Sequence, residues 1–119
     1  LKDNQSKILT FAGLSSFDKT LVKYYSTGMK TRLAISIALE ADADILLIDE
    51  SFAEVGDVGF RDKAHHALIQ KAETGKTILH ATHSMEMVRK YCDAVLFMEN
   101  GEATYYQDVE KAITRYQNL

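Results

Sequence analysis

The amino-acid sequence predicts an α/β domain, in which parallel strands form a sheet and helices pack on it. Short strand-like segments at 45–48, 76–82 and 94–98 are separated by longer segments with helical patterns. A strand, helix, strand, helix, strand order is typical of a right-handed parallel α/β layer. With 119 residues, of which 46% are hydrophobic and 26% charged, the chain is long enough for one domain with a buried core.

Two helices are expected before the first strand. Asp3 or Asn4 can cap a short helix through 5–14, and Gly13 is a suitable residue to end it. After a loop over 15–24, the strongest helical pattern runs from Thr27 to about Ala41. Its apolar positions recur at three and four residues and predict a wide buried stripe: Leu33, Ala34, Ile37, Ala38 and Ala41.

The segment 45–48 predicts the first strand. Four consecutive aliphatic residues followed by acids indicate a strand buried on both faces, as parallel strands usually are. A helix is expected from about Val58 to Glu73, with Gly75 ending it. The next strand lies within 76–82.

The last third of the chain predicts a helix, a hairpin and a closing helix. Ser84 can cap a short helix over 85–91, and the apolar run 94–98 predicts a third buried strand. Asn100-Gly101 is a typical hairpin turn and leads into a fourth strand. The closing helix is expected over 108–117.

Composition and charge exclude several classes of function. The formal net charge is -3 and the basic residues are scattered, which disfavours a nucleic-acid-binding surface. Cys92 is the single cysteine, so no internal disulfide can form, which suits a reducing compartment. The longest apolar runs are far shorter than the roughly 20 residues that a membrane-spanning helix needs. A membrane role would therefore come through a partner.

Acidic residues follow the first strand, where α/β proteins of this type usually bind their ligands. Asp49 and Glu50 come directly after the aliphatic run, and the pleat of a strand sends neighbouring side chains to opposite sides. Mg²⁺ takes one or two carboxylates and completes its shell with water and substrate phosphates. The second acid could then orient or deprotonate a water. A strand end that simply emerges into solvent explains the same acids equally well.

Two further segments could contact an anion. Ser26 and Thr27 can cap the helix that begins there, and Gly28 allows close approach to its exposed N–H groups. Ordinary helix capping explains them too. His83 lies just past the second strand and could donate to a phosphate oxygen or hold a water, although a lone histidine is more often structural.

The other histidines suggest no metal site. His80 lies inside a strand and is expected to pack there. His65 and His66 are adjacent on a helix, about 100° apart, and cannot easily share a metal ion. One cysteine and no ligand pair at helical spacing disfavour zinc.

Four short motifs, taken in order, resemble the second half of the nucleotide-binding domain of ABC-type ATPases. They are "YSTGM", "ILLIDE", "VGD" and "ATHS". "YSTGMKTRLAISIAL" with "ILLIDE...VGD" is most similar to the ATPase subunits of bacterial polysaccharide, O-antigen and teichoic-acid exporters. The resemblance covers nearly the whole chain, including "FAGLSSF" and "ENGEATYY".

The resemblance implies a role for each matching residue. Ser26, Thr27 and Gly28 would form the signature loop, which contacts the γ-phosphate of ATP held by the opposite subunit of a dimer. Asp49 would be the Walker B acid that acts on Mg²⁺ directly or through water. Glu50 would be the general base or water-orienting residue.

It also implies roles for two residues farther along the chain. Asp57 would belong to the loop that crosses the dimer interface, and His83 would be the switch histidine at the γ-phosphate. "ESFAEVGD" is one residue longer between Glu50 and Asp57 than the family pattern. Thr27 stands where most relatives have glycine.

The phosphate-binding loop G-x-x-x-x-G-K-[ST] does not occur in these 119 residues, nor does the glutamine loop. We therefore expect the chain to be the C-terminal part of a domain about twice as long. Residues 1–42 would be the end of the helical subdomain with the signature, and 43–119 the second half of the ATPase core. The implied fold is a P-loop NTPase-like three-layer parallel sheet with helices on both faces, here incomplete.

The resemblance implies an ATP-hydrolysing exporter subunit for a cell-surface polysaccharide. It would bind ATP and Mg²⁺, form a head-to-tail homodimer and drive a membrane permease from the cytoplasmic face of the bacterial inner membrane. The 119 residues alone are expected to be inactive, because they lack the phosphate-binding loop. The alternatives are a soluble ABC ATPase of translation or DNA repair, for which the net acidic charge is unfavourable, and a degenerate non-catalytic partner module. The sequence does not name the exported glycan.

Overall fold

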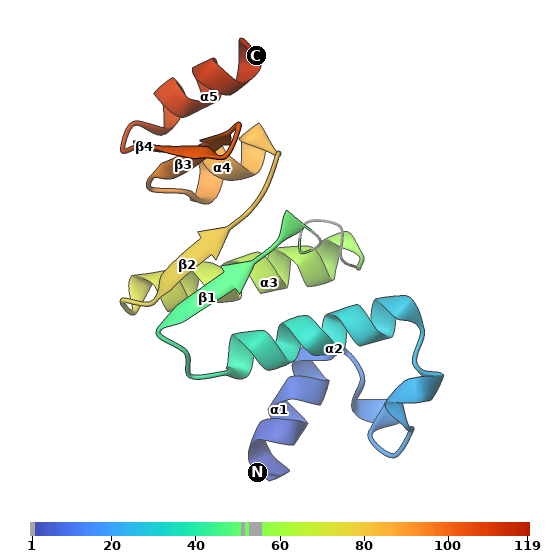
Figure 1. Ribbon diagram of the computed structural model, residues 1–119. Coiled ribbons are helices and arrows are strands. Elements are labelled where there is room, and N and C mark those ends of the chain that lie inside the picture. The colour runs from blue at the N-terminus through green and yellow to red at the C-terminus, as the bar shows by residue number, and fades with distance from the viewer. Residues whose placement is uncertain (1, 51, 53–55) are drawn as a thin grey trace. The chain divides into compact units, whose positions relative to one another are not determined.

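The computed structural model describes residues 2–50, 52 and 56–119, and it divides into two compact units (Figure 1). The first unit extends to Ala81 and the second starts at Thr82. Among the described residues, one two-stranded sheet belongs to each unit, parallel in the first and antiparallel in the second. The α/β fold class predicted from the sequence is confirmed.

The first unit begins with helix α1, Lys2–Ala12. Asp3 lies inside its first turn, so the expectation that Asp3 or Asn4 caps the helix from outside is wrong. The predicted stop is confirmed, because Gly13 has a φ of 69°, a left-handed conformation that glycine adopts without strain. The loop that follows contains two short 3-10 turns, Ser15–Phe17 and Val22–Tyr24.

Helix α2, Thr27–Glu40, has the predicted start but not the predicted buried face. Its buried residues are Ser36 and Leu39, whereas Ile37 is 50% exposed and Ala34 is exposed too. The helix is apolar around much of its circumference, and within the described residues only one side of it is covered. Periodicity identified the helix correctly but could not choose between two apolar sides.

Strands β1, Ile45–Ile48, and β2, Thr77–His80, pair in parallel, and helix α3, Val58–Glu73, connects them. The register places Ile45 beside Thr77 and Ile48 beside His80. The Ala81 N–H donates to the Ile48 carbonyl over 2.8 Å, which extends the pairing to the carboxyl end of the strands. The predicted bounds of α3 are confirmed, as is the stop at Gly75, whose φ is 91°.

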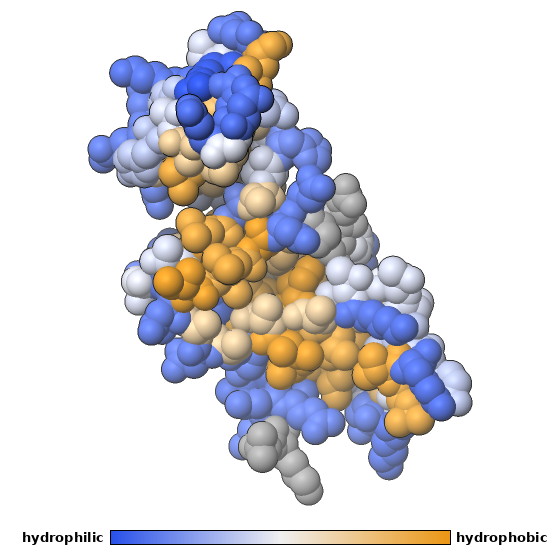
Figure 2. Space-filling view, viewed as in Figure 1, coloured by the Kyte–Doolittle hydropathy of each residue, from blue (hydrophilic) through white to orange (hydrophobic). Residues whose placement is uncertain are grey.

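One face of this sheet is covered and the other is open in the described part of the chain. Leu46, Ile48 and Ile78 pack against the core, but Ile45 is 59% and Leu47 is 72% exposed. The expectation of a first strand buried on both faces is therefore wrong here. Figure 2 shows a broad hydrophobic surface over the region where Figure 1 places β1 and β2.

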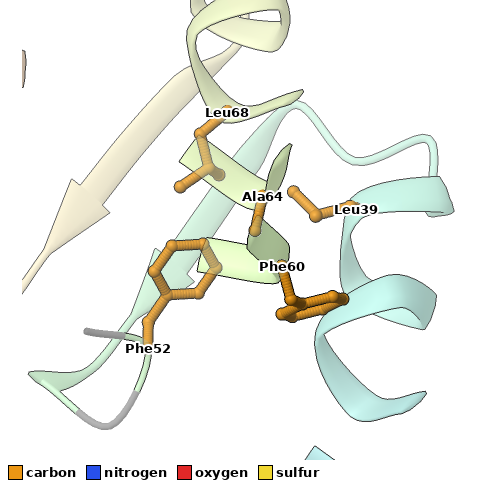
Figure 3. Close-up of a cluster of buried hydrophobic side chains, with 5 residues drawn as sticks. All are labelled: Leu39, Phe52, Phe60, Ala64 and Leu68. Carbon is orange, nitrogen blue, oxygen red and sulfur yellow. The ribbon is translucent and has the colours of Figure 1, made fainter. Parts of the chain in front are cut away.

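The core of the first unit joins α2 and α3 beside the turn that follows β1. Leu39 from α2 meets Phe60, Ala64 and Leu68 from α3, and Phe52 packs into the same cluster (Figure 3). Each of these side chains is at most 9% exposed. The cluster therefore fixes the turn after β1 against the helices.

The second unit contains α4, Met85–Tyr91, the hairpin β3–β4 and α5, Val109–Gln117. Strands β3, Val95–Glu99, and β4, Glu102–Tyr106, pair antiparallel around Asn100-Gly101, as the sequence predicts. Among the described residues, β3 pairs with β4 and not with the parallel strands, and only Phe97 of β3 is buried. The prediction of a third buried strand is thus right for its position and wrong for most of its side chains.

Candidate functional site

The start of α2 carries the polar residues Ser26, Thr27 and Gly28. Ser26 is the N-cap: its Oγ accepts a hydrogen bond from the Met29 N–H over 3.2 Å. A hydroxyl that accepts this bond keeps its own proton for donation to another group. Both Ser26 and Thr27 are exposed, so the first turn of the helix presents hydroxyls and N–H groups to solvent. These are groups that can bind an anion.

Packing within the described part of this chain does not require glycine at position 28. A Cβ built at this position would lie 3.8 Å from Arg32 Nη1 and 4.0 Å from Ser26 Oγ, which are ordinary contact distances. A side chain would therefore fit the folded protein. A requirement for glycine here would have to come from something that approaches the backbone from outside.

Arg32 lies between two of the predicted site segments, and the sequence reasoning missed it. Its Nε donates to the Ala12 carbonyl over 3.1 Å. Its guanidinium is near Gly28, and its Cδ would lie 3.7 Å from a Cβ at Gly56. Arg32 follows Gly28 by four residues on one helix, a spacing that places both on the same face and could have signalled the contact.

Asp49 and Glu50 directly follow β1, and both are exposed. The Phe52 N–H donates to the Asp49 carbonyl over 3.3 Å, which closes a tight turn that contains Glu50. A carboxylate at the carboxyl end of a parallel strand is a hard oxygen donor of the kind that Mg²⁺ prefers. The two acids are therefore placed where this fold class binds its ligands.

Asp57 is the N-cap of α3, with its Oδ1 accepting from the Phe60 N–H over 2.8 Å. The carboxylate is exposed and stabilises the helix start electrostatically as well as by this bond. Its predicted place in a loop that crosses a dimer interface stays a prediction. Residues 51 and 53–55 of "ESFAEVGD" lie outside the described residues.

The predicted site segments of the first unit lie toward the same end of that unit. Figure 1 shows three segments at this end of the unit: the first turn of α2, the carboxyl end of β1 and the first turn of α3. The contacts of Arg32 near Gly28 and Gly56 agree with this arrangement. The signature residues, the acids after β1 and Asp57 thus share one end of the unit.

His83 belongs to the second unit, where it precedes the N-cap of α4. It is exposed, and the neighbouring Ser84 N–H donates to Thr82 Oγ1 over 3.1 Å. Ser84 Oγ in turn accepts from the Met87 N–H over 3.3 Å, as expected for the cap. The segment that holds His83 is therefore tied to the start of α4. Its role as a switch histidine stays a prediction.

Known proteins resemble the chain over its whole length. The teichoic acids export ATP-binding protein TagH of Lactococcus lactis is 36% identical over all 119 residues, which are 25% of its own length. The ABC transporter protein AbcA of Aeromonas salmonicida is 35% identical over 119 residues, or 38% of its length. The chain is thus a homologue of ABC transporter ATP-binding proteins over all of its 119 residues.

A third relative is the capsule polysaccharide export ATP-binding protein CtrD of Neisseria meningitidis. It is 37% identical over 109 residues, which cover 92% of the chain and 50% of the relative. The chain thus spans between a quarter and a half of the length of these three curated relatives. No family model matches it. Among the helices of the described residues, none has both the length and the apolar character to span a bilayer.

Solved ABC proteins share the fold. MJ1267, an ATP-binding cassette of an ABC transporter, superimposes with a TM-score of 0.68 at 23% identity, over 98% of the chain and 46% of MJ1267. The cbiO1 protein of Clostridium perfringens, part of the ABC transporter complex cbiONQ, gives a TM-score of 0.61 at 27% identity. That match covers 98% of the chain and 49% of cbiO1.

Proposed function

We propose that this chain is part of an ABC ATPase that binds and hydrolyses ATP to power the export of a cell-surface polysaccharide. The observation that carries the proposal is its 36% identity over all 119 residues to a teichoic acids export ATP-binding protein. The relative in capsule polysaccharide export supports the same class of substrate. In this proposal the protein works as a head-to-tail homodimer, bound to a membrane permease at the cytoplasmic face of the inner membrane.

In this proposal, each chain of the dimer contributes residues to two ATP sites, its own and that of the partner subunit. The hydroxyl of Ser26 and the N–H groups at the start of α2 bind the γ-phosphate of ATP held by the partner subunit. Asp49 would hold Mg²⁺, whose charge would help to stabilise the transferring phosphoryl group. His83 donates a hydrogen bond to the γ-phosphate held by its own subunit.

Glu50 orients the attacking water and accepts its proton. The exposed carboxylate in the turn after β1 supports this role, as does its position directly next to the proposed Mg²⁺ ligand. Catalysis of phosphoryl transfer depends mainly on positioning and on stabilisation of charge. Loss of the Glu50 carboxylate therefore removes the hydrolytic step and leaves nucleotide binding intact.

Glu50→Gln in the full-length protein tests this assignment. ATP binding, measured by fluorescence of a labelled nucleotide, should stay within about twofold of wild type, whereas turnover should fall by at least about 100-fold. Glu73→Gln is the matched control, because Glu73 is an exposed glutamate in the last turn of α3. Its turnover should be that of wild type. Normal ATP hydrolysis by Glu50→Gln would refute the role of Glu50.

The export role needs a separate experiment. Cells that lack this ATPase should retain the polysaccharide inside, and a plasmid that carries the wild-type gene should restore it to the surface. The Glu50→Gln protein should fail to restore it. A surface polysaccharide that is unchanged in the deletion strain, together with salt-sensitive binding of RNA or DNA by the purified protein, would favour a soluble ABC ATPase of translation or repair.

A further inference from the structure

Two neighbouring tyrosines precede the Ser26 cap of α2, and their surroundings are opposite. Tyr24 is 70% exposed, whereas Tyr25 is 7% exposed. Tyr25 belongs to a buried cluster whose other buried members come from α1 and the turn after it: Leu9, Ala12 and Leu14. The residue directly before the cap is therefore anchored in the core beside α1, although it lies in a loop.

The hydroxyl and the backbone of Tyr25 provide two further anchors. The hydroxyl donates to the Phe17 carbonyl over 2.9 Å, and the two rings meet edge-on with 6.3 Å between their centroids. The Tyr25 N–H donates to the Val22 carbonyl, also over 2.9 Å. Phe17 ends the first 3-10 turn of the loop and Val22 begins the second. Tyr25 thus ties both turns of the loop to the start of α2.

Ser26 is consequently held from both sides. On the helix side, its Oγ accepts from the Met29 N–H and its carbonyl accepts from the Lys30 N–H over 3.0 Å. On the loop side it is bonded to Tyr25, and both residues have extended backbones, with ψ of 143° at Tyr25 and 163° at Ser26. Because the peptide bond between them is planar, a shift of Tyr25 passes almost directly to the Ser26 hydroxyl.

We propose that Tyr25 is a positioning residue for Ser26, because its hydrogen bond to the Phe17 carbonyl fixes the residue before the cap and thereby the Ser26 hydroxyl that meets the γ-phosphate in the partner subunit's ATP site. This inference rests on the proposed function. Tyr25 acts through Ser26 and does not contact the nucleotide. Phosphoryl transfer depends on positioning, so a small displacement of a contacting group lowers the rate. A purely structural tyrosine would change stability and leave hydrolysis by the folded protein unchanged.

Tyr25→Phe in the full-length protein removes the hydroxyl and keeps the buried ring. The kcat for ATP hydrolysis should fall about fivefold, the effect expected for one hydrogen bond, with KM for ATP within about twofold of wild type. Binding of fluorescently labelled ADP should be unchanged, because ADP lacks the γ-phosphate that Ser26 contacts. A loss of kcat without a loss of ADP affinity is not expected from a general weakening of the fold.

Tyr106→Phe is the matched control. Tyr106 is a partly buried tyrosine at the end of β4, and its hydroxyl accepts from Arg115 Nη1 over 3.0 Å. This variant also removes a hydrogen-bonded hydroxyl, but from the second unit, which contains none of the signature residues 26–28. Its kcat should equal that of wild type. Melting temperatures of all variants, measured by circular dichroism, should confirm that each is folded at the assay temperature.

A double substitution tests whether Tyr25 acts through the serine hydroxyl. Ser26→Ala alone should lower kcat, because it removes the proposed contact with the γ-phosphate. Addition of Tyr25→Phe to Ser26→Ala should lower kcat by less than about 1.5-fold further, because the group that Tyr25 positions is already gone.

The outcomes distinguish the two levels of the argument. If wild-type protein binds and hydrolyses no ATP, the proposed function fails. If wild type hydrolyses ATP and Tyr25→Phe does so at the same kcat, the positioning role fails while the function stands. The same loss of kcat from Tyr25→Phe with and without the Ser26 hydroxyl also contradicts the positioning role, because it would show that Tyr25 acts independently of that hydroxyl.

Discussion

Replacement of Gly28 by alanine should make the protein more stable and less active. Gly28 is the second residue of α2, and an added Cβ would have ordinary contacts with Arg32 and Ser26 at 3.8 and 4.0 Å. Alanine in a helix is more favourable than glycine by about 0.5–1 kcal/mol, because glycine loses more conformational freedom on folding. The free energy of unfolding, measured with urea, should rise by that amount.

The activity of Gly28→Ala should fall for a reason outside the chain itself. If the backbone at Gly28 binds a phosphate in the partner subunit's site, a methyl group would push that phosphate away from at least one N–H donor. Hydrogen bonds to charged groups contribute about 1.5–3 kcal/mol, so kcat/KM for ATP should fall about 10- to 100-fold. Steady-state hydrolysis by the full-length protein measures this effect.

Gly59→Ala provides the comparison. Gly59 occupies the equivalent second position of α3, but a Cβ there would lie 3.3 Å from Asp57 Oδ1 and would press on the cap of that helix. Its gain in stability should therefore be smaller than that of Gly28→Ala. A Gly28→Ala protein that is destabilised, or that hydrolyses ATP as fast as wild type, would refute the reasoning.

Three other changes have expected outcomes. Asp57→Ala removes the bond to the Phe60 N–H and should lower the unfolding free energy by about 1 kcal/mol in urea denaturation, whereas Asp57→Asn, which can still cap, should lose less. Arg115→Met removes the 2.6 Å ion pair with Glu99 and should lower the melting temperature by a few degrees; an unchanged value would show that this pair contributes nothing. Burial, helped by the Asp93 charge, raises the pKa of Cys92, so its thiolate is scarce at neutral pH. Alkylation of Cys92 by iodoacetamide should therefore be slow in native protein and faster in urea, and equal rates would contradict its burial.

Local patterns predicted most of the elements because the determinants of those elements are local. Ser26 and Ser84 cap α2 and α4 as expected, and Gly13 and Gly75 end α1 and α3 in left-handed conformations. In each case the side-chain oxygen or the missing Cβ acts within a few residues of its own position.

Burial was harder to predict, because it depends on what covers a surface. Ile37, Ile45 and Leu47 are apolar and were expected inside, but each is at least half exposed in the described part of the chain. The same limit applies to the site. The strand-end position of Glu50 followed from the pattern, whereas the ring contact between Phe52 and His80 joins residues 28 positions apart and leaves no periodic signal.

The open face of the parallel sheet has a consequence for handling the protein. Leu47 and Leu79, paired neighbours on β1 and β2, are 72% and 49% exposed, and each strand has one edge outside the pair in the described residues. Exposed apolar strands with unpaired edges promote aggregation. A preparation of these 119 residues alone should therefore form oligomers and precipitate as its concentration rises, and charged substitutions at Leu47 and Leu79 should raise its solubility.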